Sequence, residues 1–125
     1  MIILQHRIYR QDLRNNPGVL YVFGDNDQRK GMGGQAKEMR GEPNAVGVRT
    51  KWKPTMEEDA FYRDANFTLQ RSLLEEDLDR LDKHLKREGI VVMPSDGLGT
   101  GLSQLPTRSP RFYQHLMNEI SNLGL

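Results

Sequence analysis

The feature that most constrains the fold of this 125-residue chain is a pair of glycine-rich segments, each of which follows a short apolar run. Six of its twelve glycines lie in residues 24–47 and three lie in residues 97–101. The apolar runs that precede them, Val19–Phe23 and Ile90–Met93, have the length and the β-branched composition of buried strands. In α/β folds, ligands bind in the loops beyond the carboxyl ends of strands. The two segments therefore predict one shared ligand cleft.

The chemistry of both glycine loops favours an anionic ligand, because glycine accepts positive φ and lets a ligand approach backbone N–H groups. The first loop, Gly31-Met32-Gly33-Gly34, leads into a predicted helix whose N-terminal N–H groups and dipole favour phosphate. The second, Gly97–Gly101, adds the hydroxyl of Thr100. Together they predict a diphosphate or nucleotide ligand; the alternative is that they are only the tight turns of a small fold. Their spacing matches neither a P-loop nor a Rossmann fingerprint.

Periodicity along the rest of the chain predicts a single α/β domain over residues 1–125, with helices covering a mixed or parallel sheet. The predicted strands are Ile2–Leu4, Val19–Phe23, Ala45–Val48 and Ile90–Met93. The predicted helices are Gln35–Arg40, Ala65–Glu88 and Pro110–Leu123, and the irregular connections are Gly24–Gly34, Lys51–Asp64 and Ser95–Leu105.

Each of the two long helices has one apolar face, which predicts that both pack on the sheet. The first carries Leu74, Leu78, Leu81 and Leu85, and the second Phe112, Leu116, Ile120 and Leu123. Gly89 is expected to cap the first helix at its C-terminus. The carboxylates of that helix are expected to form a solvated face; they are Glu75, Glu76, Asp77, Asp79 and Asp82.

Composition excludes several classes of protein. The absence of cysteine rules out disulfides, thiolate zinc sites and cysteine nucleophiles, and no apolar run is long enough for a transmembrane helix. These features predict a soluble, cytoplasmic protein without a membrane partner. The net charge is +1, so no overall field draws the chain to nucleic acid, although residues 29–53 carry a net charge of +5 and residues 57–82 one of −6. Contact of the basic segment with nucleic acid stays open.

Polar residues outside the glycines are less informative. Asp25 and Asp27, on either side of Asn26, could hold Mg²⁺ or a ribose, or could cap the loop as Asx turns. The histidines have no partner at metal-ligand spacing, so neither a resident metal nor a cofactor is predicted. Trp52 is expected either to stack on a base or to join the core.

Three segments together resemble the macrodomain superfamily. They are Gly31-Met32-Gly33-Gly34-Gln35-Ala36, then Thr50-Lys51, then the run from Met93 through Pro94-Ser95-Asp96 to Gly97-Leu98-Gly99-Thr100-Gly101-Leu102. Their order and spacing are most similar to the branch with terminal ADP-ribose protein glycohydrolase and the DNA ADP-ribosyl glycohydrolase antitoxins. The run Phe23-Gly24-Asp25-Asn26 also resembles phage and bacterial proteins of unassigned function.

The resemblance implies a three-layer α/β/α macrodomain-like fold with a mixed central sheet, binding ADP-ribose or an ADP-ribosylated substrate at the strand ends. By motif position, Gly31, Gly33 and Gly34 would lie near the distal ribose and diphosphate, and Gly97–Gly101 would wrap the diphosphate. The other candidate binding residues are Asn26, Gln35, Thr50, Leu98, Thr100 and Leu102.

In the hydrolytic branch a lysine attacks the anomeric carbon of the distal ribose and an aspartate assists. The resemblance implies that Lys51 matches this lysine and that Ser103 stands where that branch has the aspartate. A serine hydroxyl cannot serve as a base near neutral pH, so Asp96, Asp25 or Asp27 would have to supply the carboxylate. Three functions stay open: a binding module for ADP-ribose or a related NAD-derived nucleotide, an ADP-ribosyl glycohydrolase, and an interaction module without a ligand.

Overall fold

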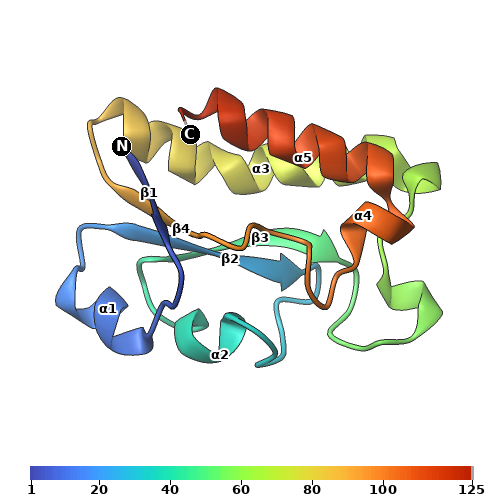
Figure 1. Cartoon of the computed structure of the whole chain (residues 1–125), viewed down its shortest axis with the longest axis horizontal. Coiled ribbons are helices and arrows are strands. Elements are labelled where there is room, and N and C mark those ends of the chain that lie inside the picture. The colour runs from blue at the N-terminus through green and yellow to red at the C-terminus, as the bar shows by residue number, and fades with distance from the viewer. Residues whose placement is uncertain (125) are drawn as a thin grey trace.

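The centre of the protein is a four-stranded sheet in the order β1-β4-β2-β3 (Figure 1), seen in a computed structural model that describes residues 1–124. Every strand pairing in it is parallel, so the expectation of a mixed sheet is wrong. Parallel neighbours need crossover connections, and helices or long loops provide them here. The strands are β1 (Ile2–Gln5), β2 (Leu20–Asn26), β3 (Ala45–Lys51) and β4 (Val91–Pro94).

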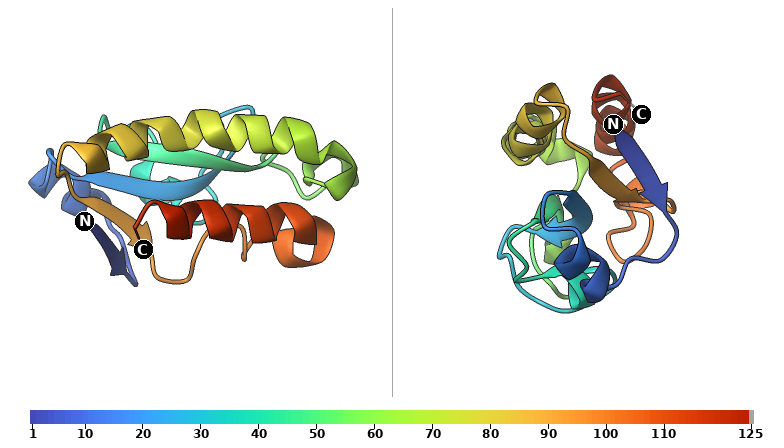
Figure 2. Two further views of the ribbon diagram at one scale, coloured as in Figure 1. Left: turned by 90° about the horizontal axis from the view of Figure 1, so that it is seen from above. Right: turned by 90° about the vertical axis from the view of Figure 1, so that its left-hand side faces the viewer.

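Helices cover both faces of this sheet (Figures 1 and 2). One face carries α1 (Arg10–Asn15) and α2 (Ala36–Met39), and the other carries α3 (Phe67–Lys86) and α5 (Pro110–Asn122). The short α4 (Leu105–Arg108) leads into α5, and the 3-10 turns Glu58–Ala60 and Asp64–Asn66 precede α3. Within residues 1–124, the helices are too short or too polar to cross a membrane.

The position of β2 inside the sheet explains why its sequence is an unbroken apolar run. Its side chains alternate between the two faces: Val22 joins the core under α3 and α5, while Tyr21 and Phe23 join the core over α1 and α2. A parallel strand buried on both faces has no solvated side on which to place polar residues. Val92 of β4 likewise faces α1 and α2, between two neighbours that face the long helices.

The predicted apolar faces of the long helices are confirmed. Leu74, Leu78 and Leu81 are buried in α3, as are Phe112, Leu116 and Ile120 in α5. Two details differ from expectation. Asp77 lies on the buried side of α3 rather than in solvent. The left-handed residue that ends the helix is Glu88 (φ 62°), whereas Gly89 is needed because a Cβ there would overlap the His84 ring.

Candidate functional site

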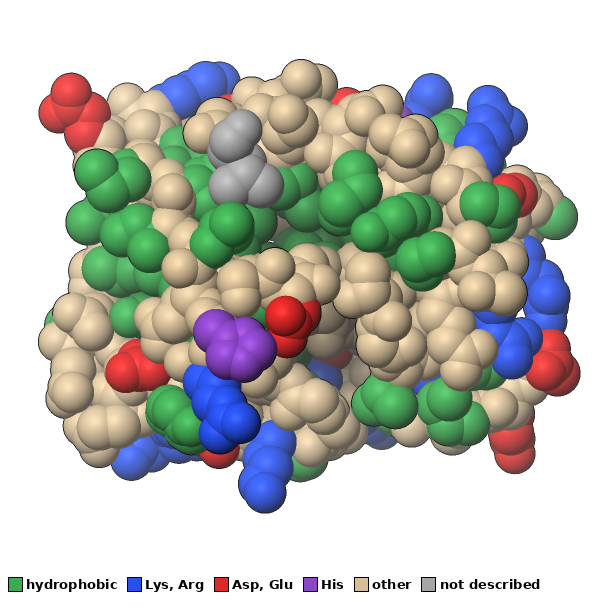
Figure 3. Space-filling model, viewed as in Figure 1, with side chains coloured by type: hydrophobic (Ala, Val, Ile, Leu, Met, Phe, Trp, Pro, Cys, Tyr) green, Lys and Arg blue, Asp and Glu red, His purple; other side chains and the backbone are tan. Residues whose placement is uncertain are grey.

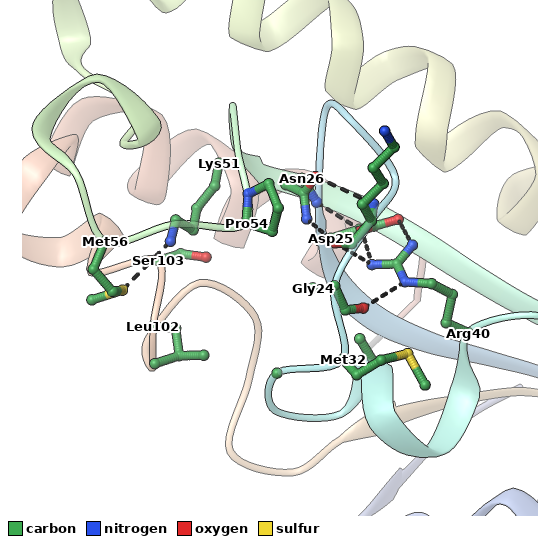
Figure 4. Close-up of a pocket in the computed structure, with 14 residues that line it drawn as sticks. Gly24, Asp25, Asn26, Met32, Arg40, Lys51, Pro54, Met56, Leu102 and Ser103 are labelled. Atoms are coloured by element: carbon green, nitrogen blue, oxygen red, sulfur yellow. Dashed lines mark hydrogen bonds and ion pairs between the residues drawn. The ribbon is translucent and has the colours of Figure 1, made fainter.

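Two adjoining pockets open where β2, β3 and β4 end. The Lys51 pocket (Figure 4) lies between the ends of β2 and β3, and the glycine pocket lies beside the end of β4. Gly24, Gly33, Leu102 and Ser103 line both, so the two pockets adjoin. The strand ends place chemistry-bearing loops from distant parts of the sequence at one edge of the sheet.

Both glycine loops line the glycine pocket. Gly33, Gly34 and Gln35 come from the first loop, and residues 97–103 come from the second. Gly34 (φ 57°), Gly97 (φ 87°) and Gly99 (φ 79°) adopt the left-handed conformation that glycine tolerates best. Gly31 of the first loop (φ 94°) lines the Lys51 pocket instead.

The two loops present backbone N–H groups that have no protein acceptor. Within residues 1–124, none of the N–H groups of residues 31–35 donates to the protein, and none of those of residues 98–103 does so. Most of the residues in both runs are exposed, so water can solvate the free loops. Successive free N–H groups in a turn are a ready site for an anion.

The helix that follows the first loop contributes less to anion binding than its sequence suggests. It spans four residues, Ala36–Met39, and the N–H groups of its first turn are already bonded to the carbonyls of Gly33, Gly34 and Gln35. A helix this short adds little dipole at its N-terminus. An anion here would therefore be held by the loop amides and not by the helix.

Among residues 1–124, Lys51 has no carboxylate partner in its pocket. Its residue is 7% exposed, and its Nζ donates to the carbonyl of Thr55, approaches Met56 Sδ at 3.6 Å and lies 4.7 Å from the ring centroid of Phe61. Burial lowers the pKa of Lys51, and the nearby charge of Arg108, whose guanidinium lies 3.7 Å from the same Phe61 ring, lowers it further. The pocket thus favours an unprotonated amine or an anionic ligand.

We expect Lys51→Met to stabilise the free protein, by about 0.5–2 kcal/mol at neutral pH, because it removes an ammonium group that is buried without a counter-charge. The lowered pKa makes the folded state prefer the neutral amine, so this gain is largest below the folded pKa of Lys51 and shrinks as pH rises toward the unfolded value. Urea denaturation at pH 7 and at about pH 10 measures both quantities. A less stable variant would show that Lys51 supports the fold.

Ser103 and Thr50 form a hydroxyl pair between the pockets. Their oxygens lie 2.5 Å apart. Thr50 is fully buried, so it cannot contact a ligand directly and can act on one only through Ser103. Ser103 itself is half-buried and lines both pockets. Thr50 thereby orients Ser103.

Two of the aspartates considered as catalytic groups, Asp25 and Asp27, are engaged by arginines. The Asp25 side chain, 3% exposed, accepts from Arg40 at 2.5 Å and 3.2 Å and from Arg29 at 3.1 Å (Figure 4 shows the Arg40 pair). Asp27 pairs with Arg49 at 3.1 Å and lines neither pocket. Neither carboxylate is free to assist Lys51. Asn26 lines the Lys51 pocket, where its amide donates to the Lys30 carbonyl at 2.7 Å.

An ion-pair network joins this site to α3. Arg29 donates to both Asp25 and Asp77, and Asp77 also accepts three hydrogen bonds from Arg49. Burial alone lowers the pKa of Arg49, but the hydrogen bonds and charge of Asp77 outweigh it and raise that pKa above its ordinary value. Gly47 is required beside this network because a Cβ would overlap the Asp25 carboxylate.

Some lining residues were not among the predicted site residues, namely Met32 and Met56 at the Lys51 pocket and His6 at the glycine pocket, whereas Leu102 was predicted. Met32, Met56 and Leu102 are each about half exposed at the mouth of the Lys51 pocket, although they lie far apart in the chain. His6 and Asp96 sit at the glycine pocket, 3.8 Å apart. No group of three or more metal-binding side chains gathers anywhere in residues 1–124. Trp52 packs on Tyr62 with ring centroids 4.5 Å apart, beside the core.

Comparison with known proteins gives one match. A model described as "Family of unknown function (DUF7831)" matches residues 3–119, from β1 to α5, and so includes both glycine loops and Lys51. No curated protein and no solved structure matches the chain.

Proposed function

The chain belongs to DUF7831, a family of unknown function, and from its pockets we propose that it binds ADP-ribose or a related NAD-derived nucleotide. The observation that carries this proposal is the pair of unbonded N–H runs, residues 31–35 and 98–103, at two adjoining pockets. One run suits one phosphate group, and two adjoining runs suit a diphosphate.

The surroundings of the amides support a nucleotide over a free inorganic anion. The Lys51 pocket adjoins the glycine pocket and is lined by the apolar side chains of Met56, Pro54 and Leu102 together with the Lys51 amine. A ligand of this shape carries a sugar or base beyond its phosphates. The macrodomain resemblance belongs to this proposal: its three motifs lie at or beyond the carboxyl ends of β2, β3 and β4, and its distal ribose would enter the Lys51 pocket.

An ADP-ribosyl glycohydrolase is the second candidate, and the buried Lys51 amine without a counter-charge favours it. Nucleophilic attack needs a neutral amine, which the lowered pKa of Lys51 helps to supply. The reaction also needs a group to carry a proton, and the neighbouring Ser103 is a hydroxyl. We therefore place binding before hydrolysis.

Gly101→Val tests the binding proposal. Gly101 lines the glycine pocket, and a Cβ there would meet no atom within 4 Å, so the fold accommodates the substitution while it adds bulk to the pocket lining. We expect it to weaken ADP-ribose binding at least about tenfold, or about 1.4 kcal/mol, in isothermal titration calorimetry. Gly18→Val is the matched control, since Gly18 is equally open but lies outside both pockets.

Three outcomes are informative. Inorganic diphosphate titrated in parallel should bind more weakly than ADP-ribose, because it cannot fill the Lys51 pocket. Equal binding of ADP-ribose by Gly101→Val and the parent would remove the glycine pocket from the proposal. No heat from any nucleotide in the parent protein would favour an interaction module without a ligand.

A further inference from the structure

The outer edge of β1 carries unpaired backbone groups. The carbonyls of Met1 and Gln5 accept from Val91 and Ser95 beside β4, each at 3.0 Å. Because backbone directions alternate along a strand, the N–H and C=O groups of Ile2 and Leu4 point away from β4. Within residues 1–124 no segment pairs with that edge.

The same edge is apolar. Met1, Ile3 and Leu4 are 71%, 41% and 51% exposed, so three of the large exposed hydrophobic side chains fall within four consecutive residues. Figure 3 shows hydrophobic side chains gathered on the face that carries β1 and α5. The partly buried residues Tyr113 and Met117 of α5 belong to the adjoining core.

The opposite edge of the sheet is closed. Along β3, the Arg49 N–H donates to Asp77 at 2.8 Å and the Gly47 carbonyl accepts from Arg29 at 2.7 Å. Lys51, at the end of the strand, already pairs with Phe61. Proteins commonly protect edge strands in this way, and β1 has no such protection.

We propose that two copies of this chain associate through antiparallel pairing of β1 with β1, which makes one continuous eight-stranded sheet. Because β3 is closed, β1 is the only open sheet edge within residues 1–124, so the assembly closes as a two-fold dimer instead of growing into a filament. The strand Ile2–Gln5 has no charged side chain that would repel its own copy.

The two-fold arrangement has a definite register. Placing Ile3 opposite Ile3 of the second copy sets Ile2 opposite Leu4, so the outward backbone groups of both strands meet in hydrogen-bonded pairs. Opposed residues of paired strands share a face, which brings Ile2 and Leu4 together on the α5 side.

This register also brings one basic side chain and one acidic side chain toward each other at each end of the paired strands. Arg7 lies just after the end of β1. Glu88 lies near the start of β1, because the next residue, Gly89, accepts a hydrogen bond from the N-terminus of Met1. Both side chains are exposed. Neither has an ion-pair partner among the described residues. Antiparallel pairing brings the end of one β1 toward the start of the other, and so each Arg7 toward the second copy's Glu88. This inference does not depend on the nucleotide proposal.

Sedimentation equilibrium of the purified protein at about 100 µM tests the proposal, since a dimer with micromolar affinity is nearly complete at that concentration. We expect twice the chain mass of 14.4 kDa. Leu4→Pro removes an N–H that points outward and leaves the β4 ladder intact, so it should shift the protein to monomer. Leu4→Lys should do the same through charge.

Leu69→Lys is the matched control, because Leu69 is equally exposed at 53% but lies on α3. It should leave the dimer intact. Circular dichroism shows whether the Leu4→Pro chain folds, and Leu4→Lys decides the question if it does not. A monomeric parent, or a folded Leu4 variant that remains dimeric, would overturn the proposal.

Discussion

Asp77→Ala is expected to lower the free energy of unfolding by about 3–5 kcal/mol, because it removes the buried carboxylate that accepts three hydrogen bonds from Arg49 and leaves that guanidinium only the more exposed Asp27 and Glu76. The Asp77 side chain is 2% exposed and that of Arg49 is 9% exposed, so little water can replace the lost contacts. The substitution also removes the acceptor of the Arg49 backbone N–H on the edge strand β3. Urea denaturation monitored by circular dichroism measures the loss.

Asp79→Ala is the control for this prediction. Asp79 lies two residues further along α3, with a side chain 57% exposed and an ion pair only to the exposed Lys83. Surface pairs of this kind contribute little, so its removal should change stability by no more than about 0.5 kcal/mol. Equal effects of the two substitutions would mean that the Asp77 network contributes no more than a solvated ion pair.

Apolar periodicity was sufficient to predict the elements that build the core. Leu74, Leu78 and Leu81 recur at the helical repeat, and the repeat alone selects the buried face of α3. The glycines were equally informative, because positive φ and close backbone approach restrict the residue type locally. The six-residue helix α1 has too few turns to show a repeat, and it was not predicted.

Charge pairing could not be predicted in the same way. Asp77 looks like its neighbours Glu76 and Asp79 in sequence, and only the approach of Arg29 and Arg49 makes it a buried partner. Asp25 is similar: its place at the end of β2 suggested a ligand contact, but its occupation by Arg40 depends on where α2 packs. Strand direction also depends on how connections cross the sheet, which local pattern does not record.

Ser103→Asp is expected to raise the release of ADP-ribose from ADP-ribosylated protein or DNA by about 10²–10⁴-fold if the site is a weakened glycohydrolase. Ser103 lines the Lys51 pocket, where no carboxylate is free, since Asp25 is held by Arg29 and Arg40. A carboxylate at this position could carry the proton that a lysine nucleophile must exchange. Ser103→Asn, similar in size but without a charge, should leave release at the parental rate.

The Lys51→Ala background separates a catalytic from an electrostatic effect of the new carboxylate. If Lys51 is the nucleophile, Ser103→Asp gains nothing without it, because the carboxylate then has no amine to serve. A gain that persists in Lys51→Ala would mean that the carboxylate activates water directly. Robust release by the parent protein that survives Lys51→Ala would rule out the lysine mechanism. ADP-ribose titration of each variant separates binding from hydrolysis. Ser103→Asp brings a negative charge to a site proposed to hold a diphosphate, so it should lower the affinity for ADP-ribose. A fall in affinity together with a rise in turnover is the combination that only a catalytic carboxylate produces.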